Sequence, residues 1–72
     1  MKTTQIISTY INKFNIIINT FSIKEGFITT IILPNNNEII IKKTKTPYDA
    51  IHTHTKIINN SYKPNFLQEL QK

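Results

Sequence analysis

The stretch from Phe27 to Lys43, FITTIILPNNNEIIIKK, most restricts what this chain can fold into. Two runs rich in β-branched residues flank Pro34-Asn35-Asn36-Asn37, a cluster whose residues either fix φ or tolerate left-handed geometry. This pattern favours two antiparallel strands joined by a tight turn. The sequence therefore predicts a β-hairpin with strands over residues 27–33 and 38–44.

The four-residue loop predicts a register in which Leu33 lies opposite Glu38. Alternation along the strands then sorts the side chains onto two faces. The expected core face carries Ile28, Thr30, Ile32, Ile39 and Ile41. The other face carries Phe27, Thr29, Ile31, Ile40 and Lys42. On this second face we expect Ile31 and Ile40 to form a semi-exposed apolar pair.

A further strand is predicted over residues 15–23, NIIINTFSI, which contains a compact block of isoleucines followed by partial alternation. Lys24-Glu25-Gly26 follows and holds the only glycine of the chain. Glycine reaches positive φ at little steric cost, so a reversal is expected there that pairs this strand with the next one.

The segment before it, Gln5 to Phe14, is the most ambiguous. Its apolar residues recur every three or four positions, which lines one side of a helix. Isoleucine, threonine and tyrosine intrinsically prefer strands, so a strand is the alternative. On periodicity we predict a helix, capped by Thr3 or Thr4.

A second helix is predicted from Thr46-Pro47-Tyr48-Asp49 to about Asn60, because a threonine cap, a proline at the first helical position and an early acid are typical of a helix start. Its inward face is expected to comprise Ala50, Ile51, His54, Ile57 and Ile58. Its solvent face is expected to comprise Asp49, His52, Lys56 and Asn59. Phe66, Leu67 and Leu70 predict one more short helical turn.

These elements predict a single small α+β domain in the order helix, three-stranded antiparallel sheet, helix (αβββα). The order resembles the double-stranded-RNA-binding domain, in which a lysine-rich start of the second helix contacts phosphates and the first helix contacts the minor groove. Here that helix start reads Pro47-Tyr48-Asp49-Ala50-Ile51, without lysine, so the resemblance covers topology and not the contacting residues.

The chain has a formal charge of +5, carried by lysine alone because it contains no arginine. It also lacks valine and is rich in isoleucine, asparagine and lysine, which predicts an AT-biased genome such as that of an organelle, a low-GC bacterium or a virus. Codon bias of this kind raises the lysine content without selection for binding, which weakens the basic charge as evidence for a polyanion partner.

Several classes of function are disfavoured. The chain has no cysteine, no glycine-rich phosphate loop and no nucleophile motif, so we expect neither an enzyme nor a cofactor. His52 and His54 lie two positions apart, about 200° around a helix, which is unsuited to chelating a metal. No apolar run is long enough to span a membrane. We therefore expect a soluble, unprocessed intracellular protein, in the cytoplasm of a low-GC host or in an organelle.

Two binding functions remain. The leading hypothesis is association with RNA or a ribonucleoprotein through Lys24, Lys42, Lys43, Lys45 and Lys56, with Tyr10, Tyr48 and Tyr62 available to stack on bases. The alternative is a protein-interaction module, such as a virus-encoded inhibitor or a small complex subunit, that binds through Ile31 and Ile40. A chain of 72 residues has only a marginal core, so a homo-oligomer is a further candidate assembly.

Overall fold

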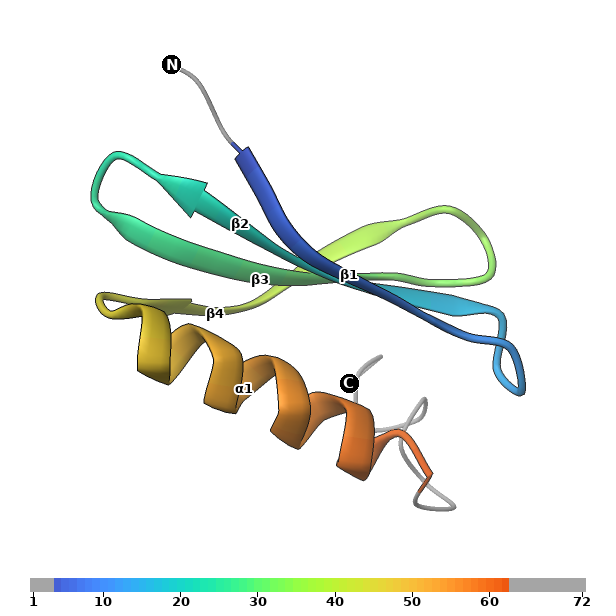
Figure 1. Ribbon diagram of the computed structural model, residues 1–72. Coiled ribbons are helices and arrows are strands. Elements are labelled where there is room, and N and C mark those ends of the chain that lie inside the picture. The colour runs from blue at the N-terminus through green and yellow to red at the C-terminus, as the bar shows by residue number, and fades with distance from the viewer. Residues whose placement is uncertain (1–3, 63–72) are drawn as a thin grey trace.

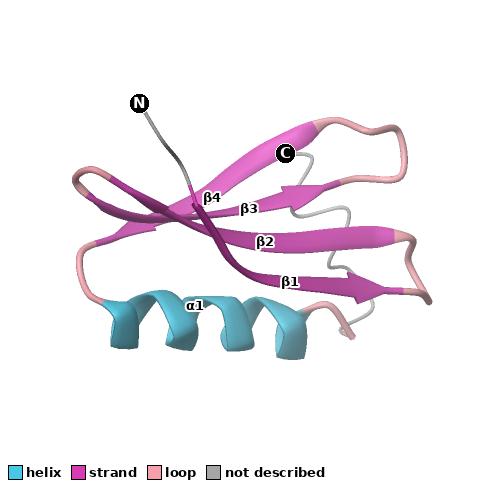
Figure 2. Ribbon diagram, turned by 45° about the horizontal axis from the view of Figure 1, so that its top comes forward, coloured by secondary structure: helices cyan, strands magenta, loops and turns pink. Residues whose placement is uncertain are grey.

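Four antiparallel strands and one helix make up the part of the chain that the computed structural model describes, residues 4–62. The strands are β1 (Thr4–Ile11), β2 (Ile16–Ile23), β3 (Gly26–Ile32) and β4 (Glu38–Thr44), and the helix is α1 (Pro47–Asn60). The strands lie in the order β1-β2-β3-β4, so each pairs with its neighbour along the chain. Figures 1 and 2 show α1 lying along one face of this sheet.

The predicted N-terminal helix is wrong, because this segment forms the edge strand β1 and pairs with β2. Its isoleucine, threonine and tyrosine side chains suit a strand better than a helix. The register with β2 shifts between Gln5 and Ile7 and leaves Ile6 as an extra residue, so a bulged strand produces the spacing that suggested a helix. The fold is therefore ββββα, and the predicted order αβββα is corrected.

The same correction removes the resemblance to the double-stranded-RNA-binding domain. That resemblance depended on a helix before the first strand and on a three-stranded sheet. The chain instead begins its sheet at Thr4 and has four strands.

The three reversals of the sheet use residues that tolerate unusual backbone angles. Asn15 adopts φ 54° at the end of the β1–β2 turn. Lys24 and Glu25 form the predicted turn between β2 and β3, and Gly26 follows with φ 141°. A Cβ atom on Gly26 would collide with the backbone oxygen of Thr44, so the β2–β3 turn packs closely against the end of β4.

The predicted β3–β4 hairpin is confirmed, and its register is the predicted one from Phe27 to Thr29 but is shifted by one residue from Thr30 to Ile32. Leu33 donates a backbone hydrogen bond to Asn37 (2.8 Å), with Asn36 at φ 70°, so Glu38 lies opposite Ile32 rather than Leu33. A second irregularity, opposite Thr29 and Thr30, inserts Ile41 as an extra residue in β4. Neither shift follows from counting residues in the loop.

The second predicted helix is confirmed as α1. The Thr46 hydroxyl accepts a hydrogen bond from the Asp49 backbone N–H (3.1 Å), and Pro47 occupies the first turn. The residues that α1 buries are Ala50, Thr53, His54 and Ile57. Ile51, which was predicted to face inward, is 51% exposed. The predicted turn at Phe66, Leu67 and Leu70 lies outside the described residues.

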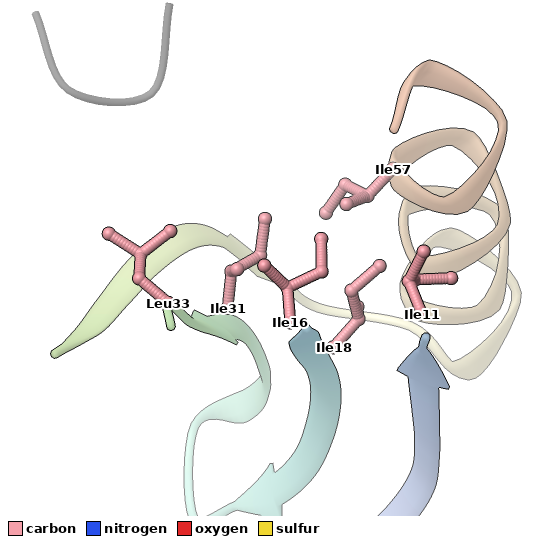
Figure 3. Close-up of a cluster of buried hydrophobic side chains, with 6 residues drawn as sticks. All are labelled: Ile11, Ile16, Ile18, Ile31, Leu33 and Ile57. Atoms are coloured by element: carbon pink, nitrogen blue, oxygen red, sulfur yellow. The ribbon is translucent and has the colours of Figure 1, made fainter. Parts of the chain in front are cut away.

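The hydrophobic core lies between α1 and the sheet. Figure 3 shows Ile57 of α1 directed toward isoleucines of the strands. The buried cluster comprises Ile11, Ile16, Ile18, Ile31, Leu33 and Ile57. The partly buried side chains packed against it are Phe14, Ile39, Ile41 and Ile58. Across residues 4–62, no helix is both long enough and apolar enough to cross a membrane.

The opposite face of the sheet is called the open face here, because no other helix or strand of residues 4–62 covers it (Figures 1 and 2). Side chains alternate along β2, so Ile16 and Ile18 point to α1 whereas the residues between them point away. The apolar side chains of the open face include Ile17, Phe21, Ile28, Ile32 and Ile40. The sheet thus has two apolar faces and one described covering helix.

Candidate functional site

A groove lined by lysines runs between the end of β4 and the first turns of α1. It encloses about 370 Å³ and is lined by Lys42, Lys43, Thr44, Lys45, Asp49, His52 and Thr53. This lysine groove exists because β4 is the edge strand of the sheet and the chain turns directly from its basic end into the helix. Its charged side chains are three lysines and one aspartate, so the groove is electropositive.

The structure brings together most of the lysines predicted to bind nucleic acid. Lys42, Lys43 and Lys45 line the groove. Lys24 lies in the β2–β3 turn, two residues before Gly26, which packs against Thr44 and Lys45. Lys56 is exposed on α1, four residues after His52, and continues the same side of the helix. Lys24 and Lys56 therefore lie beyond the groove, and Lys43 is shared between the groove and the open face, because it pairs with Ile28.

An aromatic pair lies beside the lysine groove. The rings of Tyr48 and His52 stack with centroids 6.2 Å apart and an angle of 9° between their planes. Tyr48 is 77% exposed, so one face of the pair is open to solvent. An exposed flat ring next to lysines is the combination that single-stranded nucleic acid binds, with phosphate on the lysines and a base on the ring.

His54 is placed differently from His52, as predicted, because it lies inside the molecule under α1. Its Nδ1 shares a hydrogen bond with the Thr20 hydroxyl (2.8 Å), and its Nε2 shares one with the Thr9 hydroxyl (3.0 Å). The Thr20 hydroxyl also meets that of Thr29 (3.1 Å). Burial lowers the pKa of His54 from its usual value of 6.5. With both ring nitrogens engaged, this histidine pins the helix to the sheet and is not free to bind a metal.

Residues 4–62 contain no cluster of side chains suited to binding a metal ion. No group of three or more histidine, cysteine, aspartate or glutamate side chains gathers there in a way that could hold an ion. The described acids are also dispersed: Glu25 is in a turn, Glu38 is on the open face and Asp49 is at the start of the helix.

The predicted apolar pair of Ile31 and Ile40 does not exist. Ile31 is fully buried in the core on the helix side, whereas Ile40 is 58% exposed on the open face. The corrected register explains the difference, because Ile31 pairs with Ile39 and not with Ile40. Of the two residues, only Ile40 is in a position to contact a partner.

The open face has a shallow hollow that the sequence analysis missed. It encloses about 400 Å³ and is lined by Phe21, Ile28, Thr30, Glu38 and Ile40. The Thr30 hydroxyl donates a 2.7 Å hydrogen bond to the Glu38 carboxylate, which holds this charge among apolar side chains. Alternation along β2, where Ile17 and Phe21 share a face, was the available signal for it.

Comparison of the chain with protein-family models, curated proteins and solved structures finds no match. Any functional inference therefore depends on the lysine groove and the open face themselves.

Proposed function

We propose that this protein is a small non-enzymatic RNA-binding protein, acting alone or within a ribonucleoprotein, and that the lysine groove holds the phosphate backbone. The observation that carries this proposal is the convergence of Lys42, Lys43 and Lys45 with the exposed Tyr48–His52 pair at one end of the molecule.

A cluster of lysines attracts phosphates at long range and releases counterions on contact. Three lysines share the groove with one aspartate, and Lys24 and Lys56 lie beyond it. Because a lysine ammonium is a mobile point charge, such a surface selects for charge density and carries little sequence information.

The exposed Tyr48 ring favours single-stranded RNA over a duplex. Stacking of one base on an aromatic ring contributes about 1–3 kcal/mol and requires a base that is free of its pairing partner. Tyr48 offers such a ring within the reach of the groove lysines. The proposed ligand is therefore a flexible single strand whose phosphates follow the groove and whose bases reach Tyr48.

The test is fluorescence anisotropy with a labelled single-stranded RNA across a salt series. Combined Lys42→Glu and Lys45→Glu substitution should weaken binding by more than about tenfold at low salt and should reduce the slope of log K against log salt by about one per lost phosphate contact. Tyr48→Ala should weaken binding by about fivefold or more while leaving that slope unchanged.

Lys13→Glu is the matched control, because Lys13 lies in the β1–β2 turn, where its ammonium is 5.5 Å from the centre of the Phe14 ring. This substitution changes net charge outside the groove and should have little effect. RNA binding that is undetectable at low salt would overturn the proposal. Equal weakening by Lys13→Glu would show that binding follows net charge and not the groove.

A second candidate function is protein binding through the open face, and the exposure of Ile40 beside the apolar hollow favours it. A charge at Ile40 should abolish such binding without unfolding the protein.

A further inference from the structure

We propose that the open face packs against the open face of a second copy of the chain, which forms a two-fold symmetric dimer. This inference concerns the open face, which shares only Lys43 with the lysine groove, and it does not depend on RNA binding. Its starting point is the open face, where Ile17 pairs with Ile32 and Phe21 pairs with Ile28 on either side of the buried polar pair Asn19–Thr30. Ile40 lies exposed beside Thr30 on this face, which no other helix or strand of residues 4–62 covers.

The size of the face is compatible with a small dimer. Strands of seven or eight residues, at about 3.3 Å per residue and about 4.8 Å between strands, give a face of roughly 25 by 15 Å. Two such faces in contact give a footprint of roughly 750 Å², below the roughly 1,200–2,000 Å² that stable complexes bury, so the dimer is expected to be weak and to form at high protein concentration. Sheets that pack face to face keep their strands within about 30° of each other, which a two-fold axis across the strands permits.

The open face carries one negative and one positive side chain, Glu38 and Lys43, so two copies of this face can pair opposite charges. Glu38 is at the start of β4 and lies opposite Ile32, whereas Lys43 is near its end and lies opposite Ile28, so both belong to the open face. They share this face although they are five positions apart, because the extra residue Ile41 shifts the alternation. An axis that crosses the strands at the Thr30–Ile40 pair reverses β4 and places Glu38 of one copy over Lys43 of the other.

The hollow on the open face also suits a partner that combines apolar side chains with a positive charge. Its walls are Phe21, Ile28 and Ile40, and its polar group is the Glu38 carboxylate held by Thr30. A purely apolar partner would remove that carboxylate from water without a counter-charge, which is unfavourable. A lysine supplies an apolar stem for the walls and an ammonium for the carboxylate. A second copy brings both an apolar face and Lys43.

The test is sedimentation equilibrium of the nuclease-treated full-length chain over a wide concentration range. The wild-type protein should approach the mass of a dimer as its concentration rises. Ile40→Glu should weaken association by about 100-fold, since the axis brings this residue next to its own copy and two like charges would meet. Ile51→Glu is the matched control, because Ile51 is exposed to a similar extent (51% against 58%) on α1 and should leave the dimer intact.

A charge swap keeps the proposal falsifiable if Ile40→Glu disturbs folding. Glu38→Lys and Lys43→Glu each place like charges together and should each weaken the dimer by about tenfold or more. The combined variant exchanges the two charges and should restore most of the affinity. A wild-type chain that stays monomeric at its highest soluble concentration would overturn the proposal. So would a swapped variant that associates no better than either single variant, or an Ile40→Glu variant that dimerises as the wild type does.

Discussion

The two faces of the sheet carry almost the same kind of side chain and differ in what lies over them. On the helix side, Ile16, Ile18 and Ile31 are fully buried. On the open face, Ile40 has the same chemistry and is more than half exposed. Both sets alternate along the same strands, so the local sequence does not distinguish them. Coverage by α1, and not composition, decides which isoleucines form the core.

The buried polar groups show the same contrast. On the helix side, Thr20, Thr29 and His54 satisfy one another through a chain of hydrogen bonds. On the open face, the side-chain oxygen of Asn19 is buried and has no hydrogen-bond partner in the part of the chain that is described. The helix therefore supplies a hydrogen-bonding group as well as an apolar surface. The contrast is one of degree, because Thr30 and Glu38 are paired on the open face and the buried Thr44 hydroxyl on the helix side has no partner among residues 4–62.

The largest expected effect comes from truncating one isoleucine on each face. Ile18→Ala should lower the free energy of unfolding by roughly 2–5 kcal/mol because it leaves a cavity in a closely packed core. Ile17→Ala should lower it by about 1 kcal/mol, because its half-buried side chain contributes less. Urea denaturation at low protein concentration measures both. Equal losses would show that the two faces are equally important for folding.

The next effect tests the hydrogen-bond network on the helix side. Thr20→Val keeps the shape of the side chain and leaves a His54 nitrogen without a partner, so it should lower the free energy of unfolding by about 1–3 kcal/mol. Thr30→Val is the same change on the open face. Because its partner Glu38 is exposed and can be hydrated instead, the loss there should be less than about 1 kcal/mol. A larger loss for Thr30→Val would reverse the comparison.

Low pH should lower the stability of the protein mainly by protonating His54, which lies between α1 and the sheet. Burial lowers the pKa of His54 in the folded protein, so below the usual value of 6.5 the unfolded chain binds a proton more readily than the folded one does. Stability is therefore complete above this pH and falls as the pH drops toward the folded pKa, with a slope of at most about 1.4 kcal/mol per pH unit.

The urea concentration at the midpoint of unfolding should decrease as the pH is lowered through this range, in the wild-type protein and in the His52→Gln variant. His52 is the matched control because it is exposed. The decrease should be largely absent in His54→Gln. A decrease of the same size in His54→Gln would assign the acid sensitivity to other groups.

The smallest effect is expected to be stabilising. Asn19→Val removes the unpaired oxygen from the open face and introduces a β-branched side chain into a strand, so it should raise the free energy of unfolding by up to about 1 kcal/mol. The measurement is again urea denaturation. A destabilised variant would mean that the Asn19 amide has a partner in solution.

Local signals predicted much of the fold. The Thr46-Pro47-Asp49 start located α1, and Gly26 and Pro34–Asn37 located two of the three reversals of the sheet. The N-terminal segment failed because its spacing fits either a helix or a bulged strand. What decides is the pairing of β1 with β2, a contact that depends on the fold as a whole.

The candidate sites likewise differ in whether neighbouring residues alone predict them or strand pairing is also needed. Lys42, Lys43 and Lys45 are neighbours in the sequence, so their cluster was predictable. The common face of Glu38 and Lys43 was not, because simple alternation places them on opposite faces and only the extra residue at Ile41 brings them together. Ile31 was misplaced for a different reason: α1 covers the face of β3 that carries Thr29 and Ile31, whereas the face with Ile28 and Ile32 was predicted to be the core.

The neighbour-to-neighbour order of the strands also has a kinetic consequence. Every strand pairs with the one next to it in the chain, so no pairing requires closure of a long loop. The β2–β3 hairpin, with only two residues in its turn, is the cheapest to close and is expected to nucleate the sheet, after which β1 and β4 add at its edges. Refolding should therefore be fast for a protein that is mostly sheet, and substitutions in this hairpin should slow folding more than substitutions in α1.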